Sequence, residues 1–351
     1  MIKYQEHIVL KDDQARNALK ILDELPLSAS KTLFVANSDR IVVGTVTDGD
    51  IRRGLLSGRE ISQSIEYFMN NSFKYLEQGK TNIDIIKEYK AANISLVPIL
   101  DKDFKIIEIL NLDLIRTVLP VAALLMAGGR GERLKPVTDT IPKPMLKIGN
   151  KPILEINIDR LISFGISEIF ISVKYLKEQI MDYFGDGTTK GIKIHYIEED
   201  APLGTLGALA HISSIKHEDL LVMNSDLLTN VDFEDFYNFY RHREAVMALA
   251  SIPYHISIPY AVLKINDHLV ESFIEKPTYT YYSNAGIYFM KFELKKYIEK
   301  GVFYNATDLM DKIIAETSAG LIHYPLLTYW LDIGKHQDFI KAQEDIKHIK
   351  L

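Results

Sequence analysis

The apolar positions of this chain follow two different rhythms, which change near residue 120. Up to residue 118, two units share one layout: a stretch with apolar residues at helical spacing, then two β-rich runs joined by a polar turn. The polar turns begin at Asn37 and Asp101, about sixty residues apart, which indicates an internal repeat. The sequence predicts strands at 32–36, 41–46, 96–100 and 105–110, and helices at 13–25, at 83–92, from Ile51 and from Leu112.

Beyond Pro120, which discourages continuation of a helix, apolar strands and amphipathic helices alternate. This alternation is typical of a mixed, mainly parallel α/β sheet of Rossmann-like type with helices on both faces. The predicted strands are 121–126, 168–173, 192–197 and 219–223, then 260–265, 269–274 and 285–290; the helices are 152–164, 176–184, 206–213, 233–243 and one from His336. We therefore expect a smaller α+β domain at 1–118 and a larger domain at 121–351.

Composition excludes several classes of site and of binding partner. A net charge of -6 argues against nonspecific binding of nucleic acid, which requires a basic face. The absence of cysteine excludes thiolate metal sites and cysteine nucleophiles. The first residues lack the apolar core of a signal peptide, and no apolar run approaches 18 residues. We therefore expect a cytoplasmic protein with no membrane partner.

The N-terminal repeat contains the segment GTVTDGD at residues 44–50. Thr47 and Asp50 precede a predicted helix, where such side chains favour a capping role. The layout also resembles a tandem CBS-domain pair, a module that often senses adenine nucleotides and commonly dimerises. That resemblance implies a homo-oligomer, and a regulatory adenine nucleotide whose ribose contacts Thr47 and Asp50. The second unit departs from the pattern, because Asn111 and Leu114 occupy the corresponding places. Both the cap and the ligand site remain open here.

Three glycines, Gly128, Gly129 and Gly131, follow the predicted strand 121–126. Glycine lets backbone N–H groups approach a phosphate closely, and Arg133 and Lys143 add charge that a polyphosphate can use. Prolines on both sides of Lys143 fix the path of the chain and so aim its ammonium group. The segment lacks the Gly-Lys-Ser/Thr of a Walker loop and the third glycine of a dinucleotide-binding fingerprint.

Two aspartates are candidate metal ligands. Asp226 follows closely after the predicted strand 219–223, at the edge where open α/β sheets bind ligands, although taken alone an ordinary helix-capping or turn aspartate is the favoured explanation. Asp332 lies in an apolar run, where an unpaired carboxylate is costly. Two carboxylates facing a polyphosphate suggest Mg²⁺. The ten histidines show no zinc spacing.

Together these segments resemble the sugar-1-phosphate nucleotidyltransferases, over about residues 121–345 and with the motifs in the family's order. The carrying stretches are LMAGGRGERL with PKP, then PLGTLGAL, EKP and NAGIY. The resemblance implies a nucleoside triphosphate and a sugar-1-phosphate as substrates. The resemblance also implies Arg133, Lys143 and Lys276 as catalytic residues, and Asp226 and Asp332 as Mg²⁺ ligands. The implied nucleotide-binding residues are Leu125, Ala127, Gly128, Gly129, Gly131, Glu199, Gly204 and Gly207. The implied sugar-phosphate residues are Tyr260, Glu275, Lys276 and Asn284.

Glu132 and Ala261 depart from the family pattern, which favours a small residue and glycine there, and both departures bear on the sugar. The combined architecture resembles bacterial enzymes of legionaminic-acid pathways that make GDP-glucosamine from GTP and glucosamine-1-phosphate. A mannose-1-phosphate guanylyltransferase is the next alternative, followed by a thymidylyl- or uridylyltransferase. A non-catalytic nucleotide sensor is a distant one, because an idle site has no need for the complete set of predicted cations and aspartates.

Overall fold

The computed structural model describes residues 4–26, 30–80, 83–316 and 320–351. Its contacts divide the chain into two compact units. The first consists of Met1–Pro120 with the short segments Ile162–Ser167 and Gly187–Lys193, and the second holds the remainder from Val121. No helix within the described part of the chain combines the length and the apolar character needed to cross a membrane.

The first unit contains two three-stranded sheets of the same topology, which confirms the internal repeat. In each sheet the middle strand is parallel to the first and antiparallel to the third. The strands are β1 (Ile8–Leu10), β2 (Thr32–Ala36), β3 (Val42–Thr47), β4 (Leu76–Glu77), β5 (Leu96–Leu100) and β6 (Ile106–Asn111); the helices are α1 (Ala15–Glu24), α2 (Asp48–Leu56) and α3 (Ile83–Ala91). Apolar side chains of β2, β3, β5 and β6 share one core, so the two repeats pack together.

The helix expected from Leu112 is wrong, because residues 112–120 are not helical. The Asn111 side chain accepts a hydrogen bond from the backbone N–H of Asp113 at 3.0 Å, which closes a turn instead. At the equivalent place in the first repeat, Thr47 and Asp50 form a reciprocal capping box that starts α2. Leu114 has no side-chain acceptor for such a box, so the second repeat ends without its helix.

The second unit is a mixed α/β structure with a mainly parallel central sheet, as the sequence predicts. Seven strands follow the order β11-β10-β7-β12-β17-β14-β18, and β17 is the strand antiparallel to both its neighbours. The sheet strands are β7 (Val121–Met126), β10 (Glu168–Val173), β11 (Lys193–Glu198), β12 (Asp219–Asn224), β14 (Met247–Ser257), β17 (Thr278–Lys291) and β18 (Leu321–Pro325). Two strand pairs lie outside it, β8 (Lys147–Ile148) with β9 (Lys151–Pro152) and β13 (Leu227–Thr229) with β19 (Trp330–Asp332).

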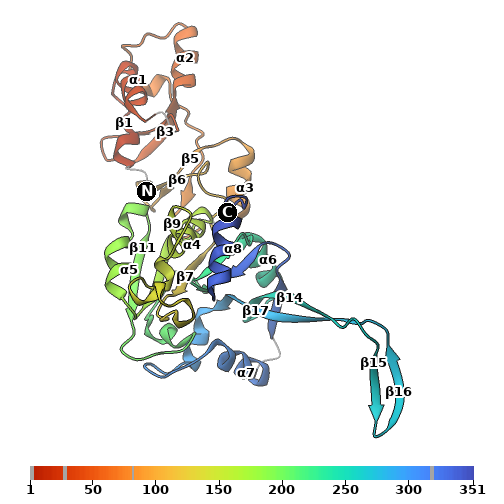
Figure 1. The fold of residues 1–351 in the computed structure, drawn as a ribbon. Helices are drawn as coiled ribbons and strands as arrows, with labels where there is room; N and C mark the ends of the chain where they lie inside the picture. The colour runs from red at the N-terminus through yellow and green to blue at the C-terminus, as the bar shows by residue number, and fades with distance from the viewer. Residues whose placement is uncertain (1–3, 27–29, 81–82, 317–319) are drawn as a thin grey trace. The chain divides into compact units, whose positions relative to one another are not determined.

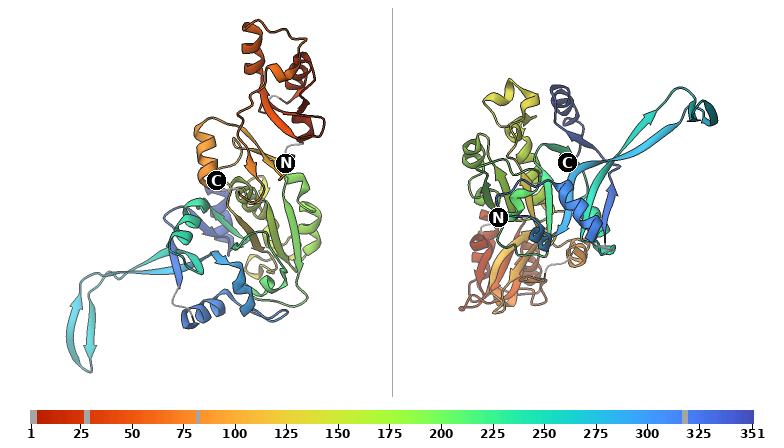
Figure 2. Two further views of the ribbon diagram at one scale, coloured as in Figure 1. Left: turned by 180° about the vertical axis from the view of Figure 1, so that it is seen from behind. Right: turned by 90° about the horizontal axis from the view of Figure 1, so that it is seen from below.

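Helices lie on both sides of this sheet (Figure 2). Met290 of β17 packs in one core with Leu309 of α7, whereas the adjacent Phe289 contacts Phe236 of α6 at a ring separation of 4.9 Å. Successive residues of a strand point to opposite faces, so α6 and α7 cover different sides. The helices are α4 (Ile153–Ser163), α5 (Lys177–Phe184), α6 (Phe233–His242), α7 (Ala306–Glu316) and α8 (His336–Asp345). The helix expected at 206–213 is a shorter 3-10 helix, Gly207–His211.

A buried carboxylate fastens α6 to the sheet. Asp219 at the start of β12 is 2% exposed and accepts hydrogen bonds at 3.0 Å from the hydroxyls of Tyr237 and Tyr240. Arg241 and Lys291 complete its neutralisation, with N–O distances of 2.9 and 3.0 Å. Burial and the neighbouring Asp219 raise the pKa of the Tyr240 hydroxyl, so it stays a donor at neutral pH.

We expect Tyr240→Phe to lower the free energy of unfolding by about 1.5–3 kcal/mol, because it deletes one hydrogen bond to a buried charged group. Urea unfolding followed by circular dichroism measures this loss. Tyr67→Phe is the matched control, since Tyr67 is 59% exposed and should change stability little. Equal effects from the two substitutions would contradict the anchoring role of Asp219.

The strands β14 and β17 continue past the sheet as a two-stranded ribbon (Figure 1). Beyond the ribbon, β15 (Val262–Asn266) and β16 (Leu269–Ile274) form a separate antiparallel hairpin. We call residues 254–282, which span the outer ribbon and the hairpin, the arm. Every residue of β16 is exposed, so neither face of the hairpin contributes to the core of this unit.

Candidate active site

The candidate site lies where the parallel strands β7, β10 and β12 end together. Met126, Ser172 and Asn224 are paired neighbours at these ends. The apolar side chains of β7 are almost fully buried, which fixes this strand inside the sheet. The glycine loop therefore begins at the carboxyl edge of the sheet. The backbone N–H of Ala127 donates to the Ser172 carbonyl at 2.9 Å, so the loop leaves the sheet in a defined direction.

The three glycines of this loop serve different purposes. Gly131 has φ of +64°, which favours glycine, and its carbonyl accepts a hydrogen bond from the Thr138 hydroxyl at 2.9 Å. A Cβ on Gly128 would lie 3.0 Å from a carboxylate oxygen of Glu199. A Cβ on Gly129 would meet no atom within 4 Å, although this residue lines a cavity. Gly129 is therefore the point where a ligand can approach the backbone closely.

Lys143 ion-pairs with both predicted metal ligands. Its ammonium group contacts Asp226 Oδ2 directly and lies 3.7 Å from Asp332 Oδ1. The two aspartates meet because β13 and β19 are paired, with Leu227 opposite Asp332. The backbone N–H of Ile333 also donates to the Asp226 carbonyl at 3.2 Å. The sequence placed Lys143 on the phosphates, but did not predict its pairing with the carboxylates.

The electrostatics of the pair suit a divalent cation. Among the described residues, neither Asp226 Oδ1 nor Asp332 Oδ1 has a hydrogen-bond partner, although both atoms are shielded from solvent. Burial, followed by the neighbouring Asp226 charge, raises the pKa of the Asp332 carboxyl, while Lys143 and Arg133 oppose the rise. No described cluster offers three acidic or histidine ligands, so the protein supplies two carboxylates and leaves room for phosphate oxygens and water. This donor set fits Mg²⁺.

Arg133 joins this group from the short 3-10 helix Glu132–Leu134. A Cβ on Gly334 would lie 3.2 Å from the Arg133 guanidinium, so this glycine lets the cation lie beside the β19 segment. The Gly334 backbone N–H donates to the Asp332 carbonyl at 2.9 Å, which holds that segment in a tight turn. Two cations and two carboxylates therefore gather from segments far apart in the sequence.

Glu199 fixes the wall opposite the glycine loop. The Ser172 hydroxyl donates to its Oε1, and the Leu203 backbone N–H donates to its Oε2 at 3.2 Å. Gly204, with φ of +75°, leaves space for the Tyr304 carbonyl, which would lie 2.6 Å from an added Cβ. Gly207 donates its backbone N–H to the same carbonyl at 3.1 Å. Both glycines thus let this turn pack closely against the backbone at Tyr304.

The loop and the turn enclose a cavity of about 490 Å³, large enough for a nucleotide. Its wall contains Gly128, Gly129, Glu199, Gly204 and Asp226 from the predicted set, together with the unpredicted Arg130, Lys174, Thr205, Asn224 and Phe303. Gly207 does not line this cavity. Leu125 is buried within β7, and Ala127, the first residue of the loop, is also buried. Both therefore position the loop rather than line the cavity.

Buried polar residues that the sequence did not reveal support Asp226. The Ser225 hydroxyl donates to the Met126 carbonyl at 2.6 Å, and the Asn157 amide donates to the Ser225 carbonyl at 3.1 Å. Asn157 is 1% exposed on α4, between apolar neighbours. A lone asparagine at a buried helical position was the available signal, because buried amides usually satisfy a specific partner.

The predicted sugar-side residues do not join this cluster. Tyr260 is 75% exposed on the arm, and Glu275 and Lys276 are exposed at its junction between β16 and β17. Asn284 lies closer, at the base of the ribbon, where its side chain donates to the Tyr288 hydroxyl and accepts from the Gly286 N–H, both at 2.9 Å. The structure therefore brings together the predicted metal ligands and part of the predicted nucleotide-binding set, but leaves the EKP segment apart from them.

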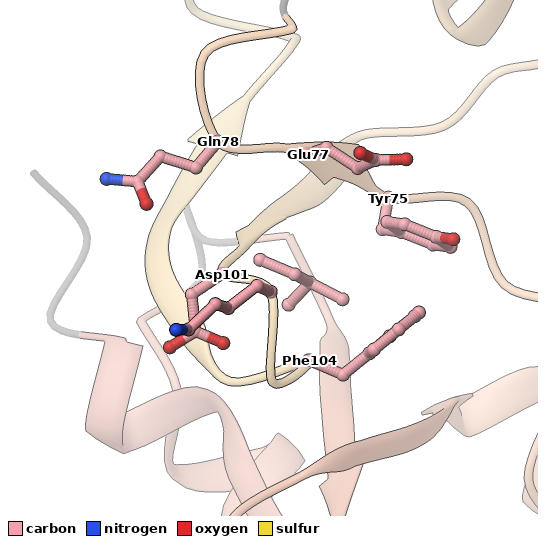
Figure 3. Close-up of a pocket in the computed structure, with 7 residues that line it drawn as sticks. Tyr75, Glu77, Gln78, Asp101 and Phe104 are labelled. Carbon is pink, nitrogen blue, oxygen red and sulfur yellow. The ribbon is translucent and has the colours of Figure 1, made fainter.

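In the N-terminal unit, Thr47 and Asp50 are engaged with one another. The Asp50 carboxylate accepts hydrogen bonds from the Thr47 backbone and hydroxyl at 2.9 and 2.6 Å, and it also pairs with Arg53. A cavity of this unit lies elsewhere, between β4 and the turn that joins β5 to β6, and is lined by Tyr75, Glu77, Gln78, Asp101 and Phe104 among others (Figure 3). Capping of α2 is thus the role that the structure gives to Thr47 and Asp50.

Residues 122–349 match the protein family described as nucleotidyl transferase. Similar proteins include probable mannose-1-phosphate guanylyltransferase 1 of Oryza sativa subsp. japonica, 30% identical over 227 residues and 62% of each chain. The mannose-1-phosphate guanylyltransferase of Mycobacterium tuberculosis is 28% identical over 64% of each chain. The UTP--glucose-1-phosphate uridylyltransferase of Synechocystis is 29% identical over 65% of each. The matched region thus spans 62 to 65% of these relatives' length.

Two solved structures have a similar fold. The putative glucose-1-phosphate thymidylyltransferase of Bacillus anthracis aligns with a TM-score of 0.53 at 19% identity, over 66% of this chain and 97% of that one. HddC of Yersinia pseudotuberculosis aligns with a TM-score of 0.51 at 26% identity, over 64% of this chain and 99% of that one. The common fold is that of the second unit, whose central sheet carries the candidate site.

Proposed function

Because the chain belongs to the nucleotidyl transferase family, we propose that it joins a nucleoside triphosphate to a sugar-1-phosphate and releases pyrophosphate. The observation that carries this proposal is the meeting of Arg133, Lys143, Asp226 and Asp332 beside a cavity walled by the glycine loop. Cations and a metal-binding carboxylate pair are what two mutually repelling phosphate substrates require.

In this reaction an oxygen of the sugar phosphate attacks the α-phosphorus of the triphosphate, and the bond to the pyrophosphate oxygen breaks. Phosphate oxygen is already a competent nucleophile, so the residues need to position and neutralise rather than remove a proton. Gly129 admits the triphosphate to the loop backbone, while Arg133 and Lys143 stabilise the departing pyrophosphate. Asp226 and Asp332 would hold Mg²⁺, which supplies charge neutralisation between the phosphates when bound.

Lys143 also has a role toward the two aspartates. Its ammonium group compensates the two carboxylates, which would otherwise repel one another in a partly buried place. If Asp226 and Asp332 held Mg²⁺, its charge would compensate the two carboxylates, and the Lys143 ammonium group would be able to bind the phosphates of the nucleotide.

For the substrates themselves, we propose GTP and glucosamine-1-phosphate. The guanylyltransferase names of several relatives support the base. The sugar rests on the combination of this domain with an N-terminal repeat that resembles a CBS pair. Mannose-1-phosphate is the second candidate, since the same relatives are named for it. A uridylyl transfer has support from the Synechocystis relative.

A panel of four nucleoside triphosphates against several sugar-1-phosphates, read by pyrophosphate release, separates these candidates. We expect the highest kcat/KM for GTP with glucosamine-1-phosphate. A preference for mannose-1-phosphate would replace the sugar, and a preference for UTP or dTTP would replace the base. No pyrophosphate release with any pair would contradict the proposed reaction.

The N-terminal repeat is proposed to be a CBS pair that regulates this activity. Its two sheets of equal topology support the repeat, while the engagement of Thr47 with Asp50 means that a nucleotide must displace or extend the α2 cap. Titration of the purified protein with AMP and ATP tests this regulation by calorimetry and by pyrophosphate release. Absence of binding would leave the repeat without a nucleotide-sensing role.

We expect Gly129→Val to raise the KM for the triphosphate by on the order of tenfold or more, because a branched side chain occupies the space a phosphate needs. The fold should be unchanged, since an added Cβ meets no atom within 4 Å. Initial rates at varied triphosphate give the KM, and thermal melting verifies the fold. An unchanged KM would show that the nucleotide binds away from this loop.

A further inference from the structure

The arm exposes far more apolar surface than its size explains. Of the 26 large apolar side chains exposed among the described residues, 11 lie between Tyr254 and Tyr282. The hairpin contributes six of them: Leu263, Ile265, Leu269, Val270, Phe273 and Ile274. Isolated apolar residues on a surface need no explanation, but a contiguous group of this kind marks an interaction site.

The hairpin also lacks the support that such a structure needs. An isolated two-stranded hairpin is marginal in water unless one face packs against something. Here the described contacts across the hairpin are its backbone ladder and one surface ion pair, Lys264 with Glu271 at 2.9 Å. Leu269 and Val270 are adjacent in β16, so they lie on opposite faces, and both are exposed. A partner must cover at least one face.

The arm carries two residues that the site requires. Under the proposed function, Glu275 and Lys276 contact the sugar and its phosphate. Thr278 to Asn284 is extended chain within β17, and six residue steps span about 20 Å. Lys276 is therefore at the far end of this extended segment from Asn284 at the ribbon base. The distance is longer than a lysine side chain can reach. The site therefore lacks its sugar-phosphate cation in this arrangement of one chain.

We propose that the arm is exchanged between two copies of this chain, so that the EKP segment of one copy completes the sugar-phosphate side of the other copy's site. A second copy is the occupant that is always present with the arm, and under the proposed function its site needs the Glu275 and Lys276 that the arm displays. Exchange in both directions gives a closed two-fold assembly. The exposed apolar side chains of the hairpin then pack against the body of the other copy. The inference rests on the proposed function for its use of Lys276, but not for its docking surface.

A complementation experiment tests the exchange. Asp226→Asn and Lys276→Ala chains carry different affinity tags, are co-expressed, and the mixed dimer is purified through both tags. If the arm is exchanged, the Lys276→Ala body receives an intact arm, and the mixed dimer recovers about half of the wild-type rate. If each arm serves its own body, both sites of the mixed dimer are defective and the rate stays at the level of the parents. That result, or a fully active Lys276→Ala parent, overturns the inference while the proposed reaction stands.

A labelling experiment tests the docking surface without reference to activity. The chain contains no cysteine, so Leu269→Cys introduces a single thiol on the hairpin. Leu114→Cys is the matched control, since Leu114 is 73% exposed and Leu269 is 76% exposed. We expect purified Leu269→Cys protein to react with a maleimide at least about tenfold more slowly than the control at high concentration, and to lose this protection on dilution. Equal reactivity of the two variants at every concentration overturns coverage by a second copy, even if the wild-type chain proves to have no transferase activity.

Discussion

Asp226→Asn is expected to lower kcat by on the order of 10²–10³, by analogy with the loss of one preorganised electrostatic group from an active site. The substitution keeps the shape of the side chain but removes its charge. Under the proposed function, Mg²⁺ would lose one of the two carboxylates that would hold it, and Lys143 loses its nearest carboxylate. Since Asp332 still lies 3.7 Å from the Lys143 ammonium group, that cation keeps a carboxylate nearby, and we expect the loss to fall on turnover rather than on folding.

Pyrophosphate release at saturating substrates measures this loss, and a titration with Mg²⁺ shows whether part of the rate returns at high metal concentration. Asp311→Asn is the matched control, because Asp311 is exposed on α7 and is not among the residues that line the cavity. Thermal melting verifies that both variants are folded. Near-normal turnover of a folded Asp226→Asn protein would remove Asp226 from the site.

Arg133→Ala is expected to lower kcat/KM by a similar factor, on the order of 10²–10³. The guanidinium lies beside the β19 segment that holds Asp332, where it can meet the charge that develops on the departing pyrophosphate. Arginine binds phosphate with two parallel hydrogen bonds, which lysine cannot reproduce, so Arg133→Lys should recover only part of the rate.

Steady-state kinetics of Arg133→Ala and Arg133→Lys, in both reaction directions, separate the role in pyrophosphate stabilisation from a role in folding. Arg52→Ala provides the matched control, since Arg52 is exposed on α2 in the N-terminal unit. If pyrophosphate is the group that Arg133 holds, the KM for pyrophosphate in the reverse reaction rises. An unchanged reverse reaction would assign Arg133 to another role.

The middle strands of the central sheet, β7, β10 and β12, could be predicted because they are buried on both faces. β7 appears in the sequence as a continuous apolar run, and β10 is mostly apolar between Glu168 and Val173. The predicted bounds of both strands coincide with the observed ones. The hairpin strand β16 was also predicted at its observed bounds from its β-rich composition. What that composition did not reveal is that β16 stands away from the sheet, since local preference carries no information about the partner that covers a strand.

Other elements left a signal that went unused. In α7, the buried residues Ala306, Leu309, Met310 and Ile313 follow helical spacing, so this helix was predictable. The short strand β19 was not, because three residues are too few for a periodic pattern and its pairing with β13 is a tertiary effect. That pairing is what brings Asp332 to Asp226.

The candidate site likewise contains features that a local motif predicts and features that only the tertiary structure shows. The glycine loop, Lys143 and Asp226 each stand in a local motif, and the structure brings them together as the resemblance implied. The ion pair between Lys143 and Asp226 joins residues 83 positions apart, so no local pattern could reveal it. The placement of Glu275 and Lys276 on an exposed arm is likewise a tertiary feature that no local pattern encodes.

Transfer of the α-phosphorus is the most direct test of the proposed reaction. The purified chain is incubated with Mg²⁺, a sugar-1-phosphate and GTP labelled at the α-phosphorus, and the products are separated. We expect the label in a nucleoside diphosphate sugar, formed in equal amount with unlabelled pyrophosphate and absent from the Asp226→Asn reaction. Label that remains in GTP for every sugar-1-phosphate and every other labelled triphosphate, or that appears only in free nucleotide, would contradict nucleotidyl transfer at this site.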